Sequence, residues 1–260
     1  MKLEAFRSTG PPSHDLAFEA ELLARAAQGR CSALVTSWPG PVVVLGYAQK
    51  PAEVDLGWCR GRGIPVLRRL SGGTGVIHRG DLGVALVLPS EHPWSEGIVG
   101  LYDRFLDVLE PALVAVGGRV ERVAEPRRAG RVRSPICFED QLADTLVVGG
   151  RKAVGCSQTR RKGGVLIHAA ILLDLDADLY SGVFGVDASR VRRGLAPAVA
   201  GVDWGRVAEA VLDRLADGLG LDLEVRPRPD PVLEHLAPYR EDRWAPVPDG
   251  GMRPGSAELI

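Results

Sequence analysis

The feature that most constrains this fold is a succession of short β-prone segments between residues 32 and 89. "SALVTSW" and "PVVVLGYA" are separated by a Pro-Gly turn, and "IPVLRRL", "GVIHRG" and "GVALVLP" follow at short intervals. The connections between these segments are too short to hold crossover helices. The sequence therefore predicts strands that pair in a largely antiparallel way.

Helical periodicity appears on both sides of this region. The segment "DLAFEAELLARAAQG" carries apolar residues at helical spacing, with Ser13 as the expected N-cap and Gly29 as its end. Residues 97–118 are also helical in period, and we expect Pro111 to kink or split that helix. A second amphipathic helix covers "WGRVAEAVLDRLADGLG", followed by a strand "DLEVRP" and a short helix over 232–239. The pattern predicts an α+β fold with mixed, mostly antiparallel sheets flanked by helices.

Length and composition limit the class of protein. The 260 residues include 45% hydrophobic and 25% charged side chains, which are ordinary values for a soluble globular protein. We expect a single catalytic domain over 1–243 and a Pro/Gly-rich tail over 244–260. No apolar run is long enough to span a membrane, and the amino terminus lacks a secretory signal, so we expect a cytoplasmic protein with no membrane partner.

Charge and cysteine content narrow the possible partners and sites. A formal net charge of −1 argues against nucleic acid as a partner, so any electrostatic partner must meet a local patch. The four cysteines, Cys31, Cys59, Cys137 and Cys156, are widely spaced and form no C-x-x-C pair. We therefore expect free thiols in a reducing compartment, and no metal site.

The segment "GGRKAVGCSQTRRKGG", residues 149–164, concentrates positive charge and has no acidic residue. It predicts a hairpin that turns at Gly149-Gly150, with Lys152 just past the turn, and residues 163–176 continue as a buried strand. A second basic segment lies upstream and is expected to be an exposed loop that carries Arg127, Arg128, Arg131 and Arg133.

Common catalytic motifs are missing. "GGTGVIHRG" lacks the third glycine of a dinucleotide-binding turn, and the chain has neither a G-x-x-x-x-G-K-[ST] phosphate loop nor H-E-x-x-H. Residues 155–159 approach the hydrolase elbow G-x-S-x-G, but Thr159 replaces its last glycine and the context is a hairpin.

Three segments together carry a family resemblance: "RRLSGGTGVIH" at 68–78, "SPICFED" at 134–140, and residues 149–176. They resemble the biotin/lipoate protein ligase family, most closely its octanoyltransferase branch, and the resemblance spans roughly 15–202. It implies the fold shared by class II aminoacyl-tRNA synthetases and biotin synthetases.

The resemblance also implies roles for particular residues. Members that activate free lipoate with ATP usually carry other residues where this chain has Cys137, which favours a thioester-forming transferase with Cys137 as nucleophile. Lys152 is expected to bind the acyl carbonyl, and Cys156, the rival nucleophile, is expected to be a small core-facing thiol. The expected substrate-binding residues are Arg68, Arg69, Ser71, Gly72, Gly73, Gly75, His78, Gly155, Gln158 and His168.

The implied activity is transfer of an octanoyl or lipoyl group from acyl carrier protein, through a Cys137 thioester, to a lysine of a lipoyl domain or glycine-cleavage H protein. A thioester donor is already activated, so no cofactor is expected. Three alternatives stay open: an ATP- and Mg-dependent lipoate-protein ligase, an octanoyl amidotransferase between lipoyl domains, and a non-catalytic acyl sensor. Arg160, Arg161 and Lys162, with the upstream arginines, are expected to face an acidic protein partner.

Two positions depart from the family pattern. Arg79 stands where relatives usually have an acidic residue after the histidine that matches His78, and Asp81 is a candidate substitute for that acid. Ala169 follows His168 where the family usually has glycine.

Overall fold

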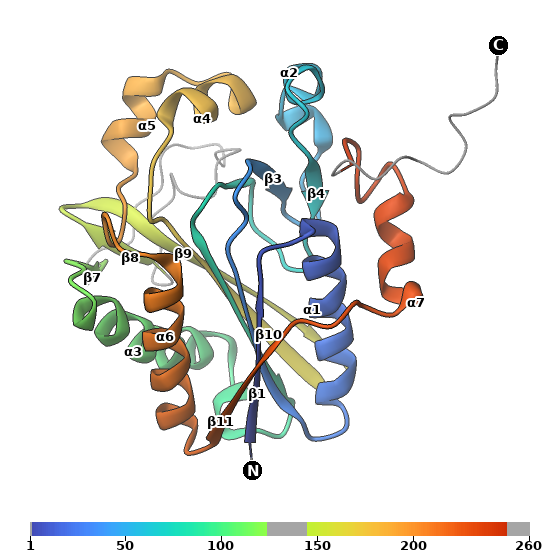
Figure 1. The fold of residues 1–260 in the computed structure, drawn as a ribbon, viewed down its shortest axis with the longest axis vertical. Coiled ribbons are helices and arrows are strands. Elements are labelled where there is room, and N and C mark those ends of the chain that lie inside the picture. Colours follow the sequence, from blue (N-terminus) through green and yellow to red (C-terminus); the bar gives the residue numbers. More distant parts are fainter. Residues whose placement is uncertain (1, 124–144, 249–260) are drawn as a thin grey trace.

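A computed structural model describes residues 2–123 and 145–248 (Figure 1). Within these residues one large sheet has the strand order β11-β1-β2-β6-β10-β9-β8-β7. Its strands are β1 (Lys2–Ser8), β2 (Cys31–Thr36), β6 (Leu82–Pro89), β7 (Glu121–Arg122), β8 (Thr145–Val148), β9 (Arg151–Arg161), β10 (Gly164–Ile171) and β11 (Asp222–Pro227). A smaller sheet has the order β4-β3-β5, from β3 (Val42–Leu45), β4 (Val66–Arg68) and β5 (Val76–His78).

Most strand pairs are antiparallel, as the short connections predict. The long β6-β10-β9-β8 part of the sheet is antiparallel throughout, and β8 and β9 are joined at Gly149 and Gly150, which both have positive φ. Three pairs are parallel: β1 with β2, β1 with β11, and β3 with β4. The sequence analysis missed β1, which pairs with two strands distant in sequence and so has no local hairpin signal.

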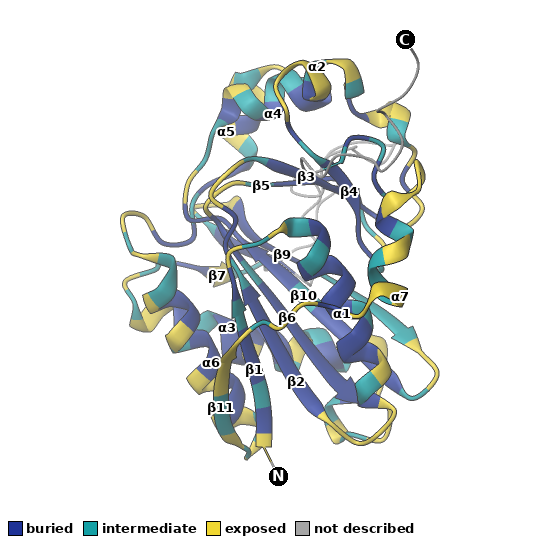
Figure 2. Cartoon of the chain, turned by 45° about the vertical axis from the view of Figure 1, so that its right-hand side comes forward, coloured by how far each residue is buried: buried dark blue, intermediate teal, exposed yellow. Residues whose placement is uncertain are grey.

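Helices cover both faces of the large sheet. On one face, α3 (Ile98–Ala115) and α6 (Trp204–Leu219) pack together over the largest hydrophobic core, and on the other face lies α1 (Pro12–Ala26). Successive side chains of a strand point to opposite faces of the sheet, and β6 illustrates this: Leu86 faces α3 and α6, whereas Val87 faces α1. Burial on both faces explains why the central strands are dark in Figure 2.

A second core lies between the small sheet and three helices that the sequence analysis did not predict. These are α2 (Leu56–Gly61), α4 (Ala177–Phe184) and α5 (Ala188–Gly194), grouped at the top of Figure 1. Each is eight residues or shorter, too short for a clear helical period. The three single-turn 3₁₀ segments are η1 (Pro51–Glu53), η2 (Pro93–Ser95) and η3 (Ala237–Arg240).

The N-cap expected at Ser13 is wrong, and of the two outcomes expected at Pro111 the split is wrong. Ser13 lies inside α1 and is buried, because the helix begins at Pro12 and its N-cap is Pro11, without a side-chain cap bond. Proline needs no hydrogen-bond partner in a first helical turn, so it suits that position. Pro111 does not split its helix, since α3 continues through it to Ala115.

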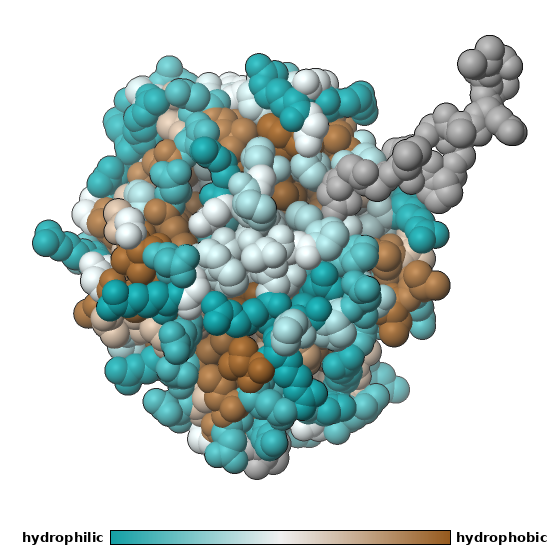
Figure 3. Space-filling view, viewed as in Figure 1, coloured by the Kyte–Doolittle hydropathy of each residue, from teal (hydrophilic) through white to brown (hydrophobic). Residues whose placement is uncertain are grey.

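The carboxy-terminal segment packs against the small sheet. After α7 (Leu233–Leu236), Trp244 and Ala245 join a hydrophobic cluster, and Val247 forms a β-bridge with Val66. The boundary expected between the catalytic domain and the tail, at residue 243, therefore falls within a segment that packs against the rest of the domain. Hydrophobic residues gather at the edge of the molecule where α7 lies (Figure 3), and Leu233 is exposed there.

Candidate functional site

A pocket lies between α1, the face of the large sheet that α1 covers, and the small sheet. It encloses about 560 Å³ of empty space, part of it open to solvent. Its apolar lining includes Leu16, Leu34, Val44, Val76, Val84, Ala85 and Ala170, and its polar lining includes Asp15, Glu19, Thr36, Trp38, Arg69, His78, Ser157 and His168. A largely apolar pocket with a few converging polar groups is the usual form of a small-ligand site.

Arg69 lines this pocket and holds the glycine-rich loop next to it. Its buried guanidinium donates to the carbonyls of Val44 (3.1 Å), Gly72 (2.7 Å) and Thr74 (3.0 Å), and its Nε donates to Ser71 Oγ at 3.1 Å. Four hydrogen bonds from one planar group fix the loop's path. Arg69 therefore orients Ser71, besides lining the pocket itself.

The glycines let this loop approach its neighbour closely. Gly73 has φ 98°, in the region that favours glycine. A Cβ on Gly46, in the loop after β3, would collide with the carbonyl of Gly73, so these two backbones touch. Gly72 and Gly75 belong to the same turn, but neither lines the pocket.

Arg68 is also buried, but its hydrogen bonds go to the backbone. Nη1 donates to the carbonyls of Gly46 (2.7 Å), Tyr47 (3.0 Å) and Gln49 (2.8 Å), and Nε donates to the carbonyl of Arg243 at 2.9 Å. Burial, reinforced by the charge of Arg243, lowers its pKa. The geometry favours a structural role for Arg68, and its expected ligand contact stays a prediction.

His168 is the centre of a polar corner of the pocket, which we call the His168 corner. Its Nε2 lies 2.5 Å from Ser71 Oγ and 2.7 Å from Ser157 Oγ, and the two hydroxyls are 2.9 Å apart. Its Nδ1 lies 3.5 Å from Glu19 Oε1. The other carboxylate oxygen of Glu19 is buried without a hydrogen-bond partner in the described part of the chain. The corner thus joins an imidazole, two hydroxyls and an incompletely paired carboxylate.

A second polar group of residues, the Asp15 chain, lines another part of the pocket. Asp15 Oδ2 accepts a hydrogen bond from Trp38 Nε1 at 2.6 Å, and Asp15 Oδ1 lies 2.5 Å from Arg228 Nε. Burial raises the pKa of Asp15, opposed by hydrogen bonds from Ser8 and Trp38 and by the charge of Arg228. The Trp38 ring meets the His78 ring edge-on, with centroids 5.0 Å apart. This chain stabilises the pocket wall from the side of β1 and α1.

Asp81 takes the place of the acidic residue that the family usually has at position 79, where this chain has Arg79. His78 Nδ1 lies 2.8 Å from Asp81 Oδ2, and the Asp81 side chain is buried. Arg79 points elsewhere, toward an exposed ion pair with Asp176. Asp81 therefore supplies a carboxylate to His78, three residues along the chain.

A β-bulge places Lys152 on the pocket side of the sheet. Leu146 pairs with Val154 and Val147 with Lys152, which leaves Ala153 without a partner on β8. Val154 faces the core under α3 and α6, so Lys152 faces the opposite side, as Gly155 does. In a regular strand Lys152 would share the face of Val154. The residue is 3% exposed, so the surface lysine typical of a hairpin is here buried on the side of the sheet that holds the pocket, although it is not one of the lining residues.

The other predicted residues of β9 divide between the two faces. Gly155 lines the pocket. Cys156 borders the pocket but packs into the core with Ala169, in line with the expected core-facing thiol. Gln158 points away, because its amide donates to the carbonyl of Ile98 at the start of α3 (2.9 Å). A substrate contact by Gln158 has no support in this geometry.

Cys137 and the arginines at 127–133 lie outside the described residues, so their expected roles stay predictions. Among residues 2–123 and 145–248, no cluster of three potential metal-binding side chains occurs. Within the same ranges, no helix combines the length and apolar character needed to cross a bilayer.

Five polar residues of the pocket lining were not predicted from the sequence: Asp15, Glu19, Thr36, Trp38 and Ser157. Asp15 and Glu19 are one helical turn apart on the buried face of α1, among Leu16 and Leu22. Carboxylates on the apolar stripe of a helix are unusual, and that pattern could have identified Asp15 and Glu19 as candidate site residues. Trp38 had no comparable signal, since it follows β2 outside any motif.

Comparisons with known proteins agree with this architecture. Among curated relatives, the octanoyltransferase LipM of Geobacillus kaustophilus is 33% identical over 71% of this chain and 70% of its own length. That of Macrococcus caseolyticus is 28% identical over 90% and 94%. A putative lipoate protein ligase from Thermoplasma acidophilum, solved with bound lipoic acid, shares the fold, with a TM-score of 0.72 at 20% identity over 92% of this chain and 94% of that one. The model of the lipoyl protein ligase A/B catalytic domain matches residues 11–204, and the chain belongs to that family.

Proposed function

We propose that this protein is an acyltransferase of lipoate assembly that moves an octanoyl group from acyl carrier protein to a lysine of a lipoyl domain or glycine-cleavage H protein. The observation that carries the proposal is the combination of relatives named octanoyltransferase with a largely apolar pocket and a lysine buried on the same side of the sheet. The apolar side chains suit an alkyl chain, and the polar residues suit its carbonyl end.

In the proposed reaction, the Cys137 thiolate attacks the carbonyl carbon of the donor thioester. The new C–S bond forms as the bond to the carrier sulfur breaks, and the carrier leaves as a thiolate that takes a proton from water. The ε-amine of the acceptor lysine then attacks the enzyme thioester, so a C–N bond forms, the C–S bond breaks and Cys137 is regenerated. An amide is more stable than a thioester, so the reaction needs neither ATP nor a metal.

Lys152 and His168 have separate roles in this scheme. The Lys152 ammonium, on the pocket face of β9, stabilises the negative charge that develops on the acyl oxygen. His168 accepts the proton that the acceptor amine loses, because its imidazole lies within hydrogen-bond distance of two hydroxyls and next to the carboxylate of Glu19.

The test is intact-protein mass spectrometry after mixing the purified protein with octanoyl-acyl carrier protein. Wild type and Cys156→Ser should each gain one octanoyl group that hydroxylamine removes, and Cys137→Ser should gain none. Release of pyrophosphate from ATP and lipoate, with activity retained in Cys137→Ser, would instead identify an ATP-dependent ligase. Octanoyl transfer from octanoyl-H protein but not from the carrier would identify an amidotransferase. Binding without any adduct or product would leave only an acyl sensor.

A further inference from the structure

Three segments distant in sequence meet around Tyr47, whose ring is partly exposed. The guanidinium carbon of Arg161, at the end of β9, lies 5.8 Å from the centre of that ring, and that of Arg243 lies 5.3 Å from it. Trp244 packs edge-on against Tyr47, with ring centres 6.0 Å apart. We call this surface the Tyr47 patch and define it by Tyr47, Arg161, Arg243 and Trp244.

Among the described residues, the two arginines of the patch have no carboxylate partner. Neither Arg161 nor Arg243 forms an ion pair with any described residue, and both side chains are exposed. Arg160, which precedes Arg161, points to the other face of the sheet and donates to the backbone carbonyls of Ser95 and Gly97, so it does not belong to the patch. Glu241 and Asp242, which precede Arg243 and are exposed, form no ion pair with either arginine in the described part of the chain. The guanidinium groups of Arg161 and Arg243 therefore concentrate positive charge around Tyr47.

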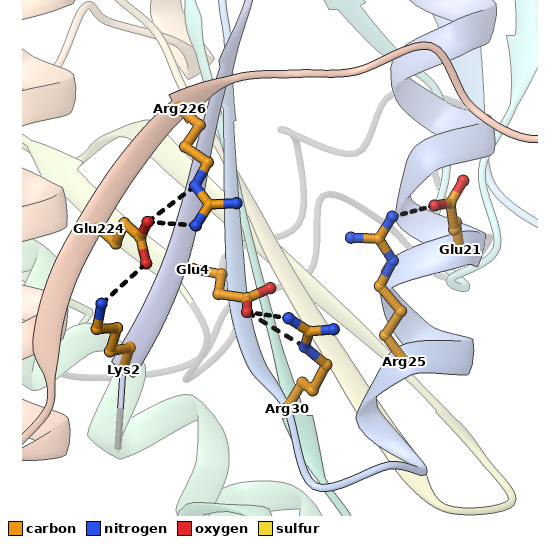
Figure 4. Close-up of polar contacts among 7 residues, drawn as sticks. All are labelled: Lys2, Glu4, Glu21, Arg25, Arg30, Glu224 and Arg226. Atoms are coloured by element: carbon orange, nitrogen blue, oxygen red, sulfur yellow. Dashed lines mark hydrogen bonds and ion pairs between the residues drawn. The ribbon is translucent and has the colours of Figure 1, made fainter.

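Figure 4 shows the opposite arrangement on another part of the surface. Around β1, β2 and β11, the cations meet carboxylates: Lys2 and Arg226 pair with Glu224, Arg30 pairs with Glu4, and on α1 Arg25 pairs with Glu21. These exposed pairs neutralise one another and leave little net field. The chain thus balances its charge in one region and leaves it unbalanced in the other.

The Tyr47 patch is hydrogen-bonded to the loop that carries Ser71, and this loop contacts the pocket residue His168. The backbone N–H of Tyr47 donates to the carbonyl of Ser71 at 2.9 Å, and the Ser71 hydroxyl contacts His168. The buried guanidinium of Arg68 links the two sides of the patch, since it binds the carbonyls of both Tyr47 and Arg243. A protein bound at the patch would lie one loop away from the His168 corner.

From these observations we infer that the Tyr47 patch is the docking surface for the acyl donor, an acidic carrier protein. The inference rests on the proposed function. Unpaired guanidinium groups attract an acidic protein, and their stacking on aromatic rings fixes them in place before binding. The donor delivers a neutral thioester, whereas the acceptor must bring a positively charged lysine, which this patch would repel. The patch therefore suits the donor rather than the acceptor.

The test compares two octanoyl donors in the acylation of the enzyme: octanoyl-acyl carrier protein, and octanoyl-N-acetylcysteamine, a small thioester that needs no docking. The test variant is Arg161→Ala/Arg243→Ala. The matched control is Arg30→Ala/Arg226→Ala, which removes two cations from the surface in Figure 4. Loss of steering charges lowers association rates by about 10- to 1000-fold. We expect the acylation rate constant with the carrier to fall about 30-fold in the test variant and to lose most of its salt dependence.

The other arms of the experiment should show no change. With the small donor, both double variants should stay within about twofold of wild type, and the control should stay within about twofold with either donor. Equal carrier rates in the test variant and the wild type would overturn the inference. A selective loss in the second step, transfer from acylated enzyme to a lipoyl domain, would assign the patch to the acceptor and overturn it as well.

A binding measurement separates this inference from the proposed function. Fluorescence anisotropy with labelled acyl carrier protein reports docking even if no acyl transfer occurs. Weaker binding by the test variant than by the control supports the patch whatever reaction the enzyme performs. Absence of carrier binding to the wild type would overturn the docking inference alone if the small donor still acylates Cys137.

Discussion

The two polar groups that line the pocket differ in how completely their carboxylates are paired. In the Asp15 chain, Asp15 Oδ2 accepts a hydrogen bond from Trp38, and Asp15 Oδ1, which accepts no hydrogen bond from the described residues, forms an ion pair with Arg228. Asp81 pairs with His78. In the His168 corner, Glu19 makes one contact of 3.5 Å and its other oxygen has no hydrogen-bond partner in the described chain. A buried carboxylate whose charge is balanced by a guanidinium holds structure, whereas one that meets only an imidazole at 3.5 Å keeps the capacity to bind a ligand or move a proton. We therefore expect substitutions in the Asp15 chain to reduce the free energy of unfolding, and substitutions in the His168 corner to reduce activity.

The largest effect is expected from Arg228→Leu. It leaves the carboxylate of Asp15 buried without its cation, and breaking a buried pair in this way costs about 3 to 5 kcal/mol. Urea unfolding should show the loss in the free energy of unfolding. Arg226→Ala is the matched control two residues away, because that arginine is exposed, and it should unfold at the same urea concentration as wild type. Identical midpoints for both variants would contradict a structural role for the Asp15 chain.

The second-largest effect is expected from His168→Ala, which tests the role of the His168 corner in activity. His168→Ala removes the proposed proton acceptor, and loss of general acid–base catalysis typically lowers rates by about 100-fold or more. We expect that loss in transfer from acylated enzyme to a lipoyl domain, with an unfolding midpoint close to wild type. If the substitution lowers stability as much as Arg228→Leu while the folded enzyme turns over normally, the two polar groups do not differ as proposed.

Sequence alone predicted one of these groups better than the other. His168 and Ser71 lie in segments with a family resemblance, so the corner was partly foreseen, although Ser157 and Glu19 were not. The Asp15 chain was missed because Arg228 reaches Asp15 from more than 200 positions away, and such a contact leaves no local pattern. The bulge that turns Lys152 toward the pocket was equally invisible, since strand alternation alone places that lysine in the core. Hairpins and long amphipathic helices were predictable because their signals are local, but the pairing of β1 was not.

Trp38→Phe is expected to have a moderate effect on stability. It removes the indole N–H that donates to Asp15 and keeps an aromatic ring against His78. Loss of a hydrogen bond to a buried charged group costs about 1.5 to 3 kcal/mol. Thermal unfolding should show a lower midpoint than wild type. Because Arg228 still pairs with Asp15, the loss should be smaller than in Arg228→Leu, and an equal or larger loss would mean that the ring itself, rather than its N–H, supports the wall.

The smallest effect is expected from single serine substitutions in the His168 corner. Both Ser71 and Ser157 contact His168 Nε2, so either hydroxyl can hold the imidazole when the other is removed. A neutral hydrogen bond contributes about 1 kcal/mol, which corresponds to a rate loss of about fivefold for Ser157→Ala. Ser71→Ala/Ser157→Ala removes both partners, so its loss in kcat/KM should exceed the product of the single losses. Strictly multiplicative losses would show that the hydroxyls act independently and that the corner does not work as one unit.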